Sequence, residues 1–225
     1  GIAHQKETKQ NAHMYYDVNE KLAIAVAKKA KAEGVKQFVI LSSMSVYGTN
    51  RGHITKQTVE NPSTHYGKSK YLADQAIIKL QAENFVVSIL RPPMVYGKGC
   101  KGNYQLLSKL KQKIPFFPNI RNERSMIYIW NLTAFVEYII KEKKNGIFFP
   151  QNAEYVNTGN MVSKIAEYNG KKMHLVPIFN WMIKILLWMR VGIAEKVFAS
   201  LTYEKVDLCE TIDFQNSIME TENKE

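Results

Sequence analysis

The stretch that decides the fold is Ser63-Thr-His-Tyr-Gly-Lys-Ser-Lys-Tyr71, which opens a segment with helical periodicity. Tyr66 and Lys70 are four residues apart, so a helix places both side chains on one face. An ammonium group beside a phenol favours the phenolate, and the pair therefore predicts a lowered pKa for Tyr66. A phenol tuned in this way can exchange a proton with a substrate hydroxyl. The pattern alone is weak, because most Tyr and Lys pairs at this spacing lie on solvated helix surfaces.

The sequence on either side of this segment strengthens the interpretation. The apolar run Val35-Lys-Gln-Phe-Val-Ile-Leu-Ser42 is typical of a buried parallel strand, and Ser43 follows it. A second strand-like run covers residues 85–90 and ends in Arg91-Pro-Pro. Ligands of open α/β sheets bind at the carboxyl ends of the strands. The order strand, serine, Tyr/Lys helix, strand thus predicts that serine and tyrosine meet at that edge.

These motifs resemble the extended short-chain dehydrogenase/reductase family, in particular its nucleotide-sugar epimerases, dehydratases and 4-ketoreductases. They are S-S-M-S-V-Y-G (42–48), Y-G-K-S-K (66–70), L-R-P-P-M-V-Y-G (90–97), K-G-N-Y (101–104) and R-S-M-I-Y-I-W-N-L (124–132). The resemblance implies an α/β fold: a partial Rossmann-like, doubly wound parallel sheet with a small C-terminal substrate-binding lobe. It begins in mid-domain, so we interpret the chain as a fragment or truncated product that lacks the N-terminal strands and glycine motif of such a domain.

The expected organisation has three parts. Residues 1–97 are the later part of the NAD-binding domain, 98–215 are mostly the substrate-binding lobe with some segments returning to the sheet, and the acidic residues 216–225 form a disordered tail. Helical periodicity predicts helices at 16–33, 63–83, 103–113, 130–143 and 160–168. In the first helix, Leu22, Ala25, Val26 and Ala30 recur on one face.

The resemblance assigns three catalytic residues. Tyr66 and Lys70 match the catalytic tyrosine and lysine, and Ser43 matches the catalytic serine that holds the sugar O4 against the phenol. Lys70 is also expected to contact the ribose of the nicotinamide. Asn19 matches an asparagine that supports the catalytic geometry.

Binding residues are assigned in the same way. Ser42 and Pro93 are expected to line the cofactor site together with Tyr66 and Lys70. Asn103, in the loop that covers the sugar nucleotide, and Arg124 are expected to bind the substrate diphosphate, to which a guanidinium can donate two parallel hydrogen bonds. The G-x-G-x-x-G pattern at 97–102 belongs to this loop and lacks the strand–turn–helix context of a dinucleotide-binding turn.

The implied activity is that of an NAD-dependent UDP-sugar 4-epimerase, with UDP-glucose or UDP-N-acetylglucosamine as substrate and a 4-keto intermediate. NADP is left open as the cofactor. Two alternatives also stay open: an NAD(P)-dependent 4-ketoreductase of a UDP-N-acetyl 6-deoxy sugar, and a truncated fragment without activity. A 4,6-dehydratase is disfavoured, because Met44 and Ser45 stand where those enzymes usually carry an Asp-Glu pair.

Composition limits the partners. The 225 residues carry a net charge of +11, but the lysines lie at helix-face and turn positions with few interleaved aromatics, which indicates a solvated surface and no nucleic-acid site. The scattered histidines, Cys100 and Cys209 lack the spacing of a metal site, and free thiols indicate a reducing cytoplasm.

Two protein surfaces are expected to make contacts. The resemblance implies a homodimer through the helices 16–33 and 63–83. The apolar segment 181–193 is too short to span a bilayer and carries Lys184 and Arg190. We expect it to pack on the substrate lobe, with peripheral membrane contact as the less favoured alternative.

Overall fold

The computed structural model describes residues 1–3, 5, 7–100, 102–110, 115–206 and 212–223, which divide into two compact units. Unit 1 comprises Gly1–Thr49, Gln57–Pro93 and Leu132–Pro150, and unit 2 comprises Asn50–Lys56, Met94–Asn131 and Gln151–Glu225. The chain thus passes between the units several times, and residues 132–150 belong to the unit that carries the three-stranded sheet.

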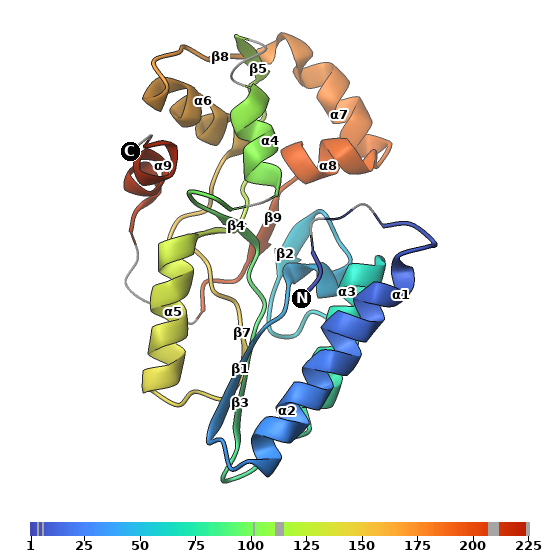
Figure 1. Ribbon diagram of the computed structural model, residues 1–225. Coiled ribbons are helices and arrows are strands. Elements are labelled where there is room, and N and C mark those ends of the chain that lie inside the picture. Colours follow the sequence, from blue (N-terminus) through green and yellow to red (C-terminus); the bar gives the residue numbers. More distant parts are fainter. Residues whose placement is uncertain (4, 6, 101, 111–114, 207–211, 224–225) are drawn as a thin grey trace. The chain divides into compact units, whose positions relative to one another are not determined.

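Unit 1 is built on three parallel strands in the order β1-β3-β7 (Figure 1). The strands are β1 (Gln37–Leu41), β3 (Val86–Leu90) and β7 (Gly146–Phe148). The helical segments are α1 (Ala12–Tyr15), the π-helical stretch η1 (Tyr16–Leu22), α2 (Ala23–Ala32), the 3₁₀ turn η2 (Met44–Tyr47), α3 (His65–Ile78) and α5 (Ile129–Lys141), the last from residue 132 onward. The predicted α/β class and its parallel strands at 35–42 and 85–90 are confirmed.

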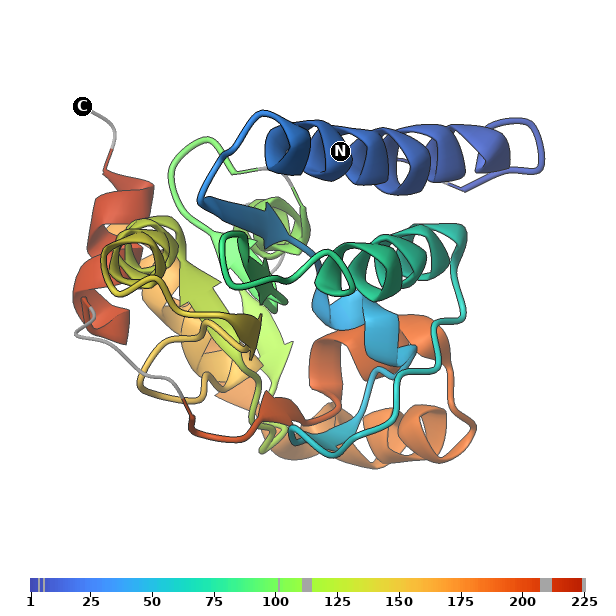
Figure 2. The ribbon, with the colours of Figure 1, turned by 90° about the horizontal axis from the view of Figure 1, so that it is seen from below.

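Both faces of this sheet are covered by helices. Val87 and Ile89 of β3 are fully buried in one apolar cluster with Ala27 of α2 and with Ala73 and Ile77 of α3. Figure 2 shows α2 and α3 running side by side. On the other face, the Phe135 ring of α5 packs edge-on against Phe148 of β7. Successive side chains along each strand point to opposite faces of the sheet and therefore pack against two layers of helices, as expected for a doubly wound sheet.

The first helix packs on unit 1 through its alanines. Ala27 is buried, whereas Leu22 and Val26 are 53% and 50% exposed. The stretch η1 is wound as a π-helix, which shifts the phase of the residues after it relative to a regular 3.6-residue repeat. The small face formed by Ala23, Ala27 and Ala30 therefore packs on unit 1, and the larger side chains point outward.

Unit 2 is held together by paired short strands and an aromatic core. Its parallel pairs are β2 (Gly52–Ile54) with β9 (Leu201–Tyr203), β4 (Met94–Tyr96) with β6 (Met126–Tyr128), and β5 (Phe116–Pro118) with β8 (His174–Val176). Its helices are α4 (Asn103–Leu110), the first turn of α5, α6 (Thr158–Tyr168), η3 (Pro177–Phe179), α7 (Asn180–Trp188), α8 (Gly192–Phe198) and α9 (Phe214–Glu222). Tyr96 stacks on Tyr104 and packs on Tyr128 at the centre of this core.

Helix α9 occupies residues for which the sequence predicted a disordered tail. Asp213 caps it by accepting a hydrogen bond from the Asn216 amide at 3.0 Å. Ile218 is completely buried, and the Tyr128 hydroxyl donates to Glu220 at 2.7 Å. The acidic composition suggested a solvated segment, but its carboxylates accept hydrogen bonds from tyrosines of the unit 2 core.

The segment 181–193 forms α7 and the start of α8, separated by Arg190 in a left-handed conformation (φ 55°). We expected this segment to pack on the substrate lobe. Ile183 is buried, but Trp181, Trp188 and Ile193 are exposed, so most of the expected packing does not occur. Among the described residues, no helix is long and apolar enough to cross a membrane.

Helix α3 lies unusually close to the turn η2. A Cβ atom at Gly67 would be 2.5 Å from the carbonyl oxygen of Ser45, well inside van der Waals contact. The turn itself ends at Gly48, which has φ 63° and therefore a conformation that favours glycine. The two glycines of S-V-Y-G and Y-G-K-S-K thus allow the serine turn and the tyrosine helix to meet.

We predict that Gly67→Ala destabilises the protein, although alanine normally stabilises a helix by about 1 kcal/mol relative to glycine. The methyl group must displace the η2 backbone, with an expected cost of about 1–3 kcal/mol. Gly192→Ala is the matched control, because a Cβ there meets no atom within 4 Å. Thermal unfolding of both variants checks this. An unchanged or raised melting temperature for Gly67→Ala would show that α3 is not in tight contact with η2.

Candidate active site

The N-terminus of α3 fixes the position of Tyr66. The Thr64 side chain caps the helix by accepting a hydrogen bond from the Gly67 amide at 3.0 Å. Tyr66 consequently lies in the first turn and is half-buried. The Ser43 side chain lies close enough to its phenol to act on the pKa of Tyr66. The structure thus brings together two of the three predicted catalytic residues.

Ser43 is held at the end of β1 by its own turn. It has an extended backbone, and its Oγ accepts a hydrogen bond from the Ser45 amide at 3.1 Å, which caps η2. The Met44 amide donates to the Pro92 carbonyl at 3.1 Å. The Arg-Pro-Pro stretch therefore lies beside the serine turn, and the predicted cofactor residue Pro93 is buried in the same unit.

The expected lowering of the Tyr66 pKa does not occur in this structure. Burial raises the pKa of Tyr66, and the nearby Ser43 hydroxyl only partly offsets this effect. Lys70 is a turn further along α3, but its ammonium donates to the Leu41 carbonyl at 2.9 Å. Burial lowers the pKa of Lys70 in turn, against the attraction of Asp74. Burial thus opposes the charged form of both side chains, and Tyr66 is left as a neutral phenol.

Asp74 and Arg91 form a buried ion pair next to Ser42, which the sequence did not predict. Asp74 Oδ2 accepts hydrogen bonds from Ser42 Oγ at 2.8 Å and from Arg91 Nε at 3.0 Å. Arg91 Nη1 donates to the Tyr47 hydroxyl at 2.8 Å and to Glu60 at 2.6 Å. This network ties the carboxyl ends of β1 and β3 to α3, at the edge where the candidate site lies.

Burial governs the charges of this network. It raises the pKa of Asp74, although Arg91 and Ser42 act in the opposite direction. Burial also opposes the charge on Arg91, but attraction from Asp74 outweighs it and the pKa of Arg91 is raised. The predicted role of Ser42 at the cofactor remains a prediction, and its hydroxyl is engaged by Asp74. The spacing of Tyr66, Lys70 and Asp74 by four residues on one helix face was the signal that could have revealed the network.

The N-terminus of α3 also carries a carboxylate that the sequence did not suggest. The amides of His65 and Tyr66 donate to the two oxygens of Glu7 at 3.0 and 2.9 Å. An anion at this position satisfies amides that have no partner within the helix and interacts favourably with the helix dipole. Glu7 thus fixes the backbone of Tyr66 itself.

Asn19 supports the site from η1, as the resemblance implied for its position. It is buried, its Nδ2 donates to the Ile2 carbonyl at 2.8 Å, and its Oδ1 accepts from the Ile2 amide at 2.7 Å. Its Nδ2 also lies 3.5 Å from the Ser69 hydroxyl, which itself donates to the Tyr66 carbonyl. Its catalytic role remains a prediction.

The predicted substrate residues belong to unit 2. Arg124 Nη1 donates to the Ala199 carbonyl at 2.7 Å and to the Glu195 carbonyl at 3.4 Å, at the C-terminal end of α8. Burial lowers the pKa of Arg124 to about 10, which leaves it cationic at neutral pH. Asn103 is the first residue of α4, but its side chain lies outside the described part of the structure. Diphosphate binding by both residues stays a prediction.

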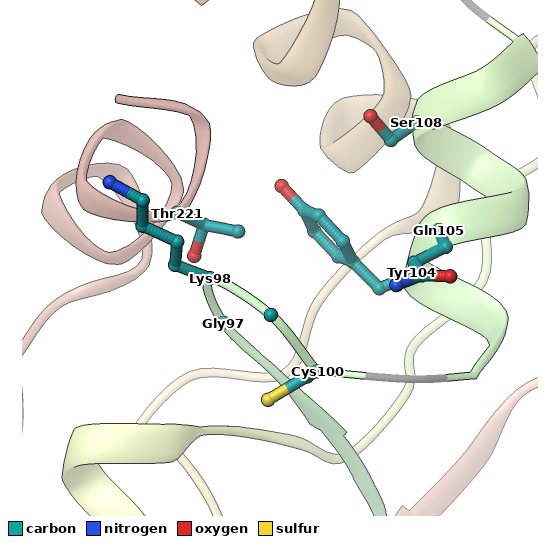
Figure 3. Close-up of a pocket in the computed structure, with 8 residues that line it drawn as sticks. Gly97, Lys98, Cys100, Tyr104, Gln105, Ser108 and Thr221 are labelled. Atoms are coloured by element: carbon teal, nitrogen blue, oxygen red, sulfur yellow. The ribbon is translucent and has the colours of Figure 1, made fainter. Parts of the chain in front are cut away.

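The glycine-rich loop lines a pocket of about 410 Å³ within unit 2 (Figure 3). Its lining residues are Gly97, Lys98, Gly99, Cys100, Tyr104, Gln105, Ser108 and Thr221. The Tyr104 side chain reaches from α4 towards α9, where its hydroxyl donates to Glu222 at 2.7 Å. Burial raises the pKa of the Cys100 thiol, which therefore stays protonated at neutral pH. The pocket carries one lysine and several hydroxyl groups.

We predict strong energetic coupling between Asp74 and Arg91. Arg91→Met leaves the Asp74 carboxylate buried without its cation and is expected to cost about 3–5 kcal/mol of unfolding free energy. Asp74→Leu removes the buried carboxylate at Nε and leaves the guanidinium with Glu60 and Tyr47, whereas the double variant removes both charges of the pair. Denaturant unfolding of the four proteins should therefore give a double-variant cost smaller than the sum of the single costs, by at least about 1 kcal/mol. Additive costs would show that the pair is not coupled.

Comparisons with known proteins agree with this geometry. The NAD dependent epimerase/dehydratase family matches residues 1–148. A UDP-glucose 4-epimerase of Vibrio cholerae is 30% identical over 211 residues, covering 88% of this chain and 63% of the relative. The N-acetyl-alpha-D-glucosaminyl-diphospho-ditrans,octacis-undecaprenol 4-epimerase of Escherichia coli O157:H7 is 30% identical over 173 residues, covering 72% of this chain and 52% of the relative.

A solved structure extends the similarity to the fold. The UDP-glucuronic acid 4-epimerase of Bacillus cereus, crystallised in complex with NAD, superposes with a TM-score of 0.75 at 15% identity, covering 98% of this chain and 69% of that one. The chain thus spans between about half and two thirds of the length of the two curated relatives. With the family match over most of its residues, the chain belongs to the NAD-dependent epimerase/dehydratase family.

Proposed function

We propose that the protein is an NAD-dependent nucleotide-sugar 4-epimerase that acts on a UDP-hexose, either UDP-glucose or UDP-N-acetylglucosamine. The observation that carries this proposal is that Ser43, at the carboxyl end of β1, lies beside the Tyr66 phenol in the first turn of α3, with Lys70 one turn along the same helix. Family membership and the Vibrio cholerae relative support the choice of a nucleotide sugar.

The mechanism assigns one task to each side chain. Ser43 donates to or accepts from the sugar O4 and holds it against Tyr66. Tyr66 takes the proton of the C4 hydroxyl and later returns it to O4. When bound, NAD would supply the redox chemistry at C4. The residues present fit this cofactor, because Lys70 places an ammonium donor at the strand edge where Rossmann folds bind dinucleotides, and Pro93 is buried beside the serine turn.

Lys70 must act differently when the substrate is bound. Burial holds Tyr66 protonated, which suits proton return but opposes proton removal. Movement of the Lys70 ammonium from the Leu41 carbonyl towards the phenol would favour the phenolate. We propose that this movement switches Tyr66 from acid to base. Because the base form of Tyr66 is the phenolate, turnover is expected to rise with pH as Tyr66 loses its proton.

The proposed assembly is a homodimer through α2 and α3. Leu22 and Val26 of the first helix and Leu72 of α3 are exposed, and Figure 2 shows that the two helices run side by side. Large apolar side chains on two adjacent helices are typical of a helical interface.

A second candidate substrate carries the same sugar diphosphate on a polyprenol. The Escherichia coli relative is an epimerase of such a substrate by name. The observation that favours this candidate is the exposed apolar surface of α7 and α8, which suits a protein that works beside a membrane.

We predict that Tyr66→Phe lowers turnover of UDP-glucose or UDP-N-acetylglucosamine by at least about 100-fold, because it removes the group that moves the proton. UDP-sugar affinity, measured by calorimetry, should change by less than about threefold, since the ring remains. Tyr71→Phe, on the same helix, is the matched control and should keep its activity.

Full activity of Tyr66→Phe would contradict the role of Tyr66 as the group that moves the proton. Net consumption of NADH or NADPH without formation of an epimer would replace the 4-epimerase by the 4-ketoreductase. Wild-type activity on the polyprenyl-linked sugar alone would select the second candidate.

A further inference from the structure

Unit 2 exposes a continuous run of large apolar side chains, which we term the α7–α8 face. Its residues are Ile178, Phe179, Trp181, Met182, Ile185, Trp188, Met189 and Ile193. Trp188 is 83% exposed, Ile193 80% and Trp181 66%. Single exposed apolar residues are ordinary, but a cluster of this size marks an interaction surface.

Helix α7 is apolar on both sides. Ile183 is buried, and Leu186 and Leu187 are partly buried, so these residues form its inner side. Trp181, Ile185 and Trp188 follow the i, i+4, i+7 spacing and therefore share the opposite, outer side. The buried and partly buried side chains of α7 thus lie on its inner side, and its outer side is left exposed.

The charges around this face have one sign. Between residues 169 and 200 the exposed cationic side chains are Lys171, Lys172, Lys184, Arg190 and Lys196. The one carboxylate in this range, Glu195, is buried and accepts a hydrogen bond from Arg51 Nε at 2.7 Å. Lys184 follows Trp181 by three residues, and Arg190 follows Trp188 by two. Within residues 169–200, which carry the apolar surface, the exposed charged side chains are therefore all positive.

We propose that the α7–α8 face docks the protein on the surface of a bilayer that contains anionic phospholipids. Tryptophan with lysine or arginine is the combination that settles at the boundary between headgroups and acyl chains. The apolar side chains would enter this boundary, while Lys184 and Arg190 would lie at the lipid phosphates. A second copy of the chain is a poorer occupant, because a two-fold interface would place two cationic faces against each other.

This docking goes beyond the proposed reaction and holds for either substrate class. It is a peripheral contact, made by the outer side of α7 and the start of α8. Vesicle binding needs neither sugar nor cofactor, so its failure would not affect the proposed epimerase, and failure of the epimerase would not affect it.

The test is co-sedimentation of the chain with vesicles of phosphatidylcholine alone or mixed with phosphatidylglycerol. We expect at least about tenfold stronger partitioning to the anionic vesicles at about 0.1 M salt, weakening towards about 1 M salt as the charges are screened. Trp181→Ala with Trp188→Ala should reduce it at least about tenfold. Trp130→Ala is the matched control, because Trp130 is 60% exposed but lies on α5, outside the face.

A second variant separates charge from apolar contact. Lys184→Glu with Arg190→Glu should abolish the preference for anionic vesicles and leave the weaker binding to neutral vesicles unchanged. All substituted side chains are exposed, and circular dichroism checks that the fold is kept. Three results would overturn the proposal: no vesicle binding by the wild type, unchanged binding by the double tryptophan variant, or a dimer in solution that this variant dissociates, which would assign the face to a second copy.

Discussion

The close contact between α3 and the turn η2 is the constraint on which the rest of the candidate site depends. Gly67 lies so near the Ser45 carbonyl that a methyl group would not fit. This distance brings the first turn of α3 to the end of β1, where Tyr66 reaches Ser43. Side chains at both ends secure the arrangement: Glu7 and Thr64 cap the helix, and Ser43 caps the turn. The position of Tyr66 beside Ser43 thus follows from backbone packing.

The buried pair of Asp74 and Arg91 stabilises the same edge from behind. Arg91 follows β3, Asp74 lies two turns after Tyr66 on α3, and Ser42 follows β1, so one carboxylate joins three elements. A buried ion pair contributes little net stability but penalises any arrangement that separates its partners. The network therefore specifies how the strands and α3 fit together more than it adds to the free energy of folding.

The sequence predicted the elements with a strong local signal. Apolar runs identified β1 and β3, and helical periodicity identified α3 and α5, because both signals depend on neighbouring residues. Contacts between distant segments left no such signal: Glu7 lies 58 residues from His65, and composition could not show that Glu220 meets Tyr128. The π-helical winding of η1 altered the phase of α2, and the fall expected in the Tyr66 pKa failed because burial outweighed Lys70.

In the proposed reaction, Tyr66 moves the proton of the C4 hydroxyl, and no side chain removes the hydrogen that is bonded to C4 itself. Turnover of UDP-glucose or UDP-N-acetylglucosamine in D₂O, followed by mass spectrometry and proton NMR of both epimers, tests it most directly. We expect the two epimers to interconvert with the original hydrogen retained at C4. Deuterium at C4 of the product would show that a side chain had abstracted the carbon-bound proton, and would contradict the role given to Tyr66 and Ser43.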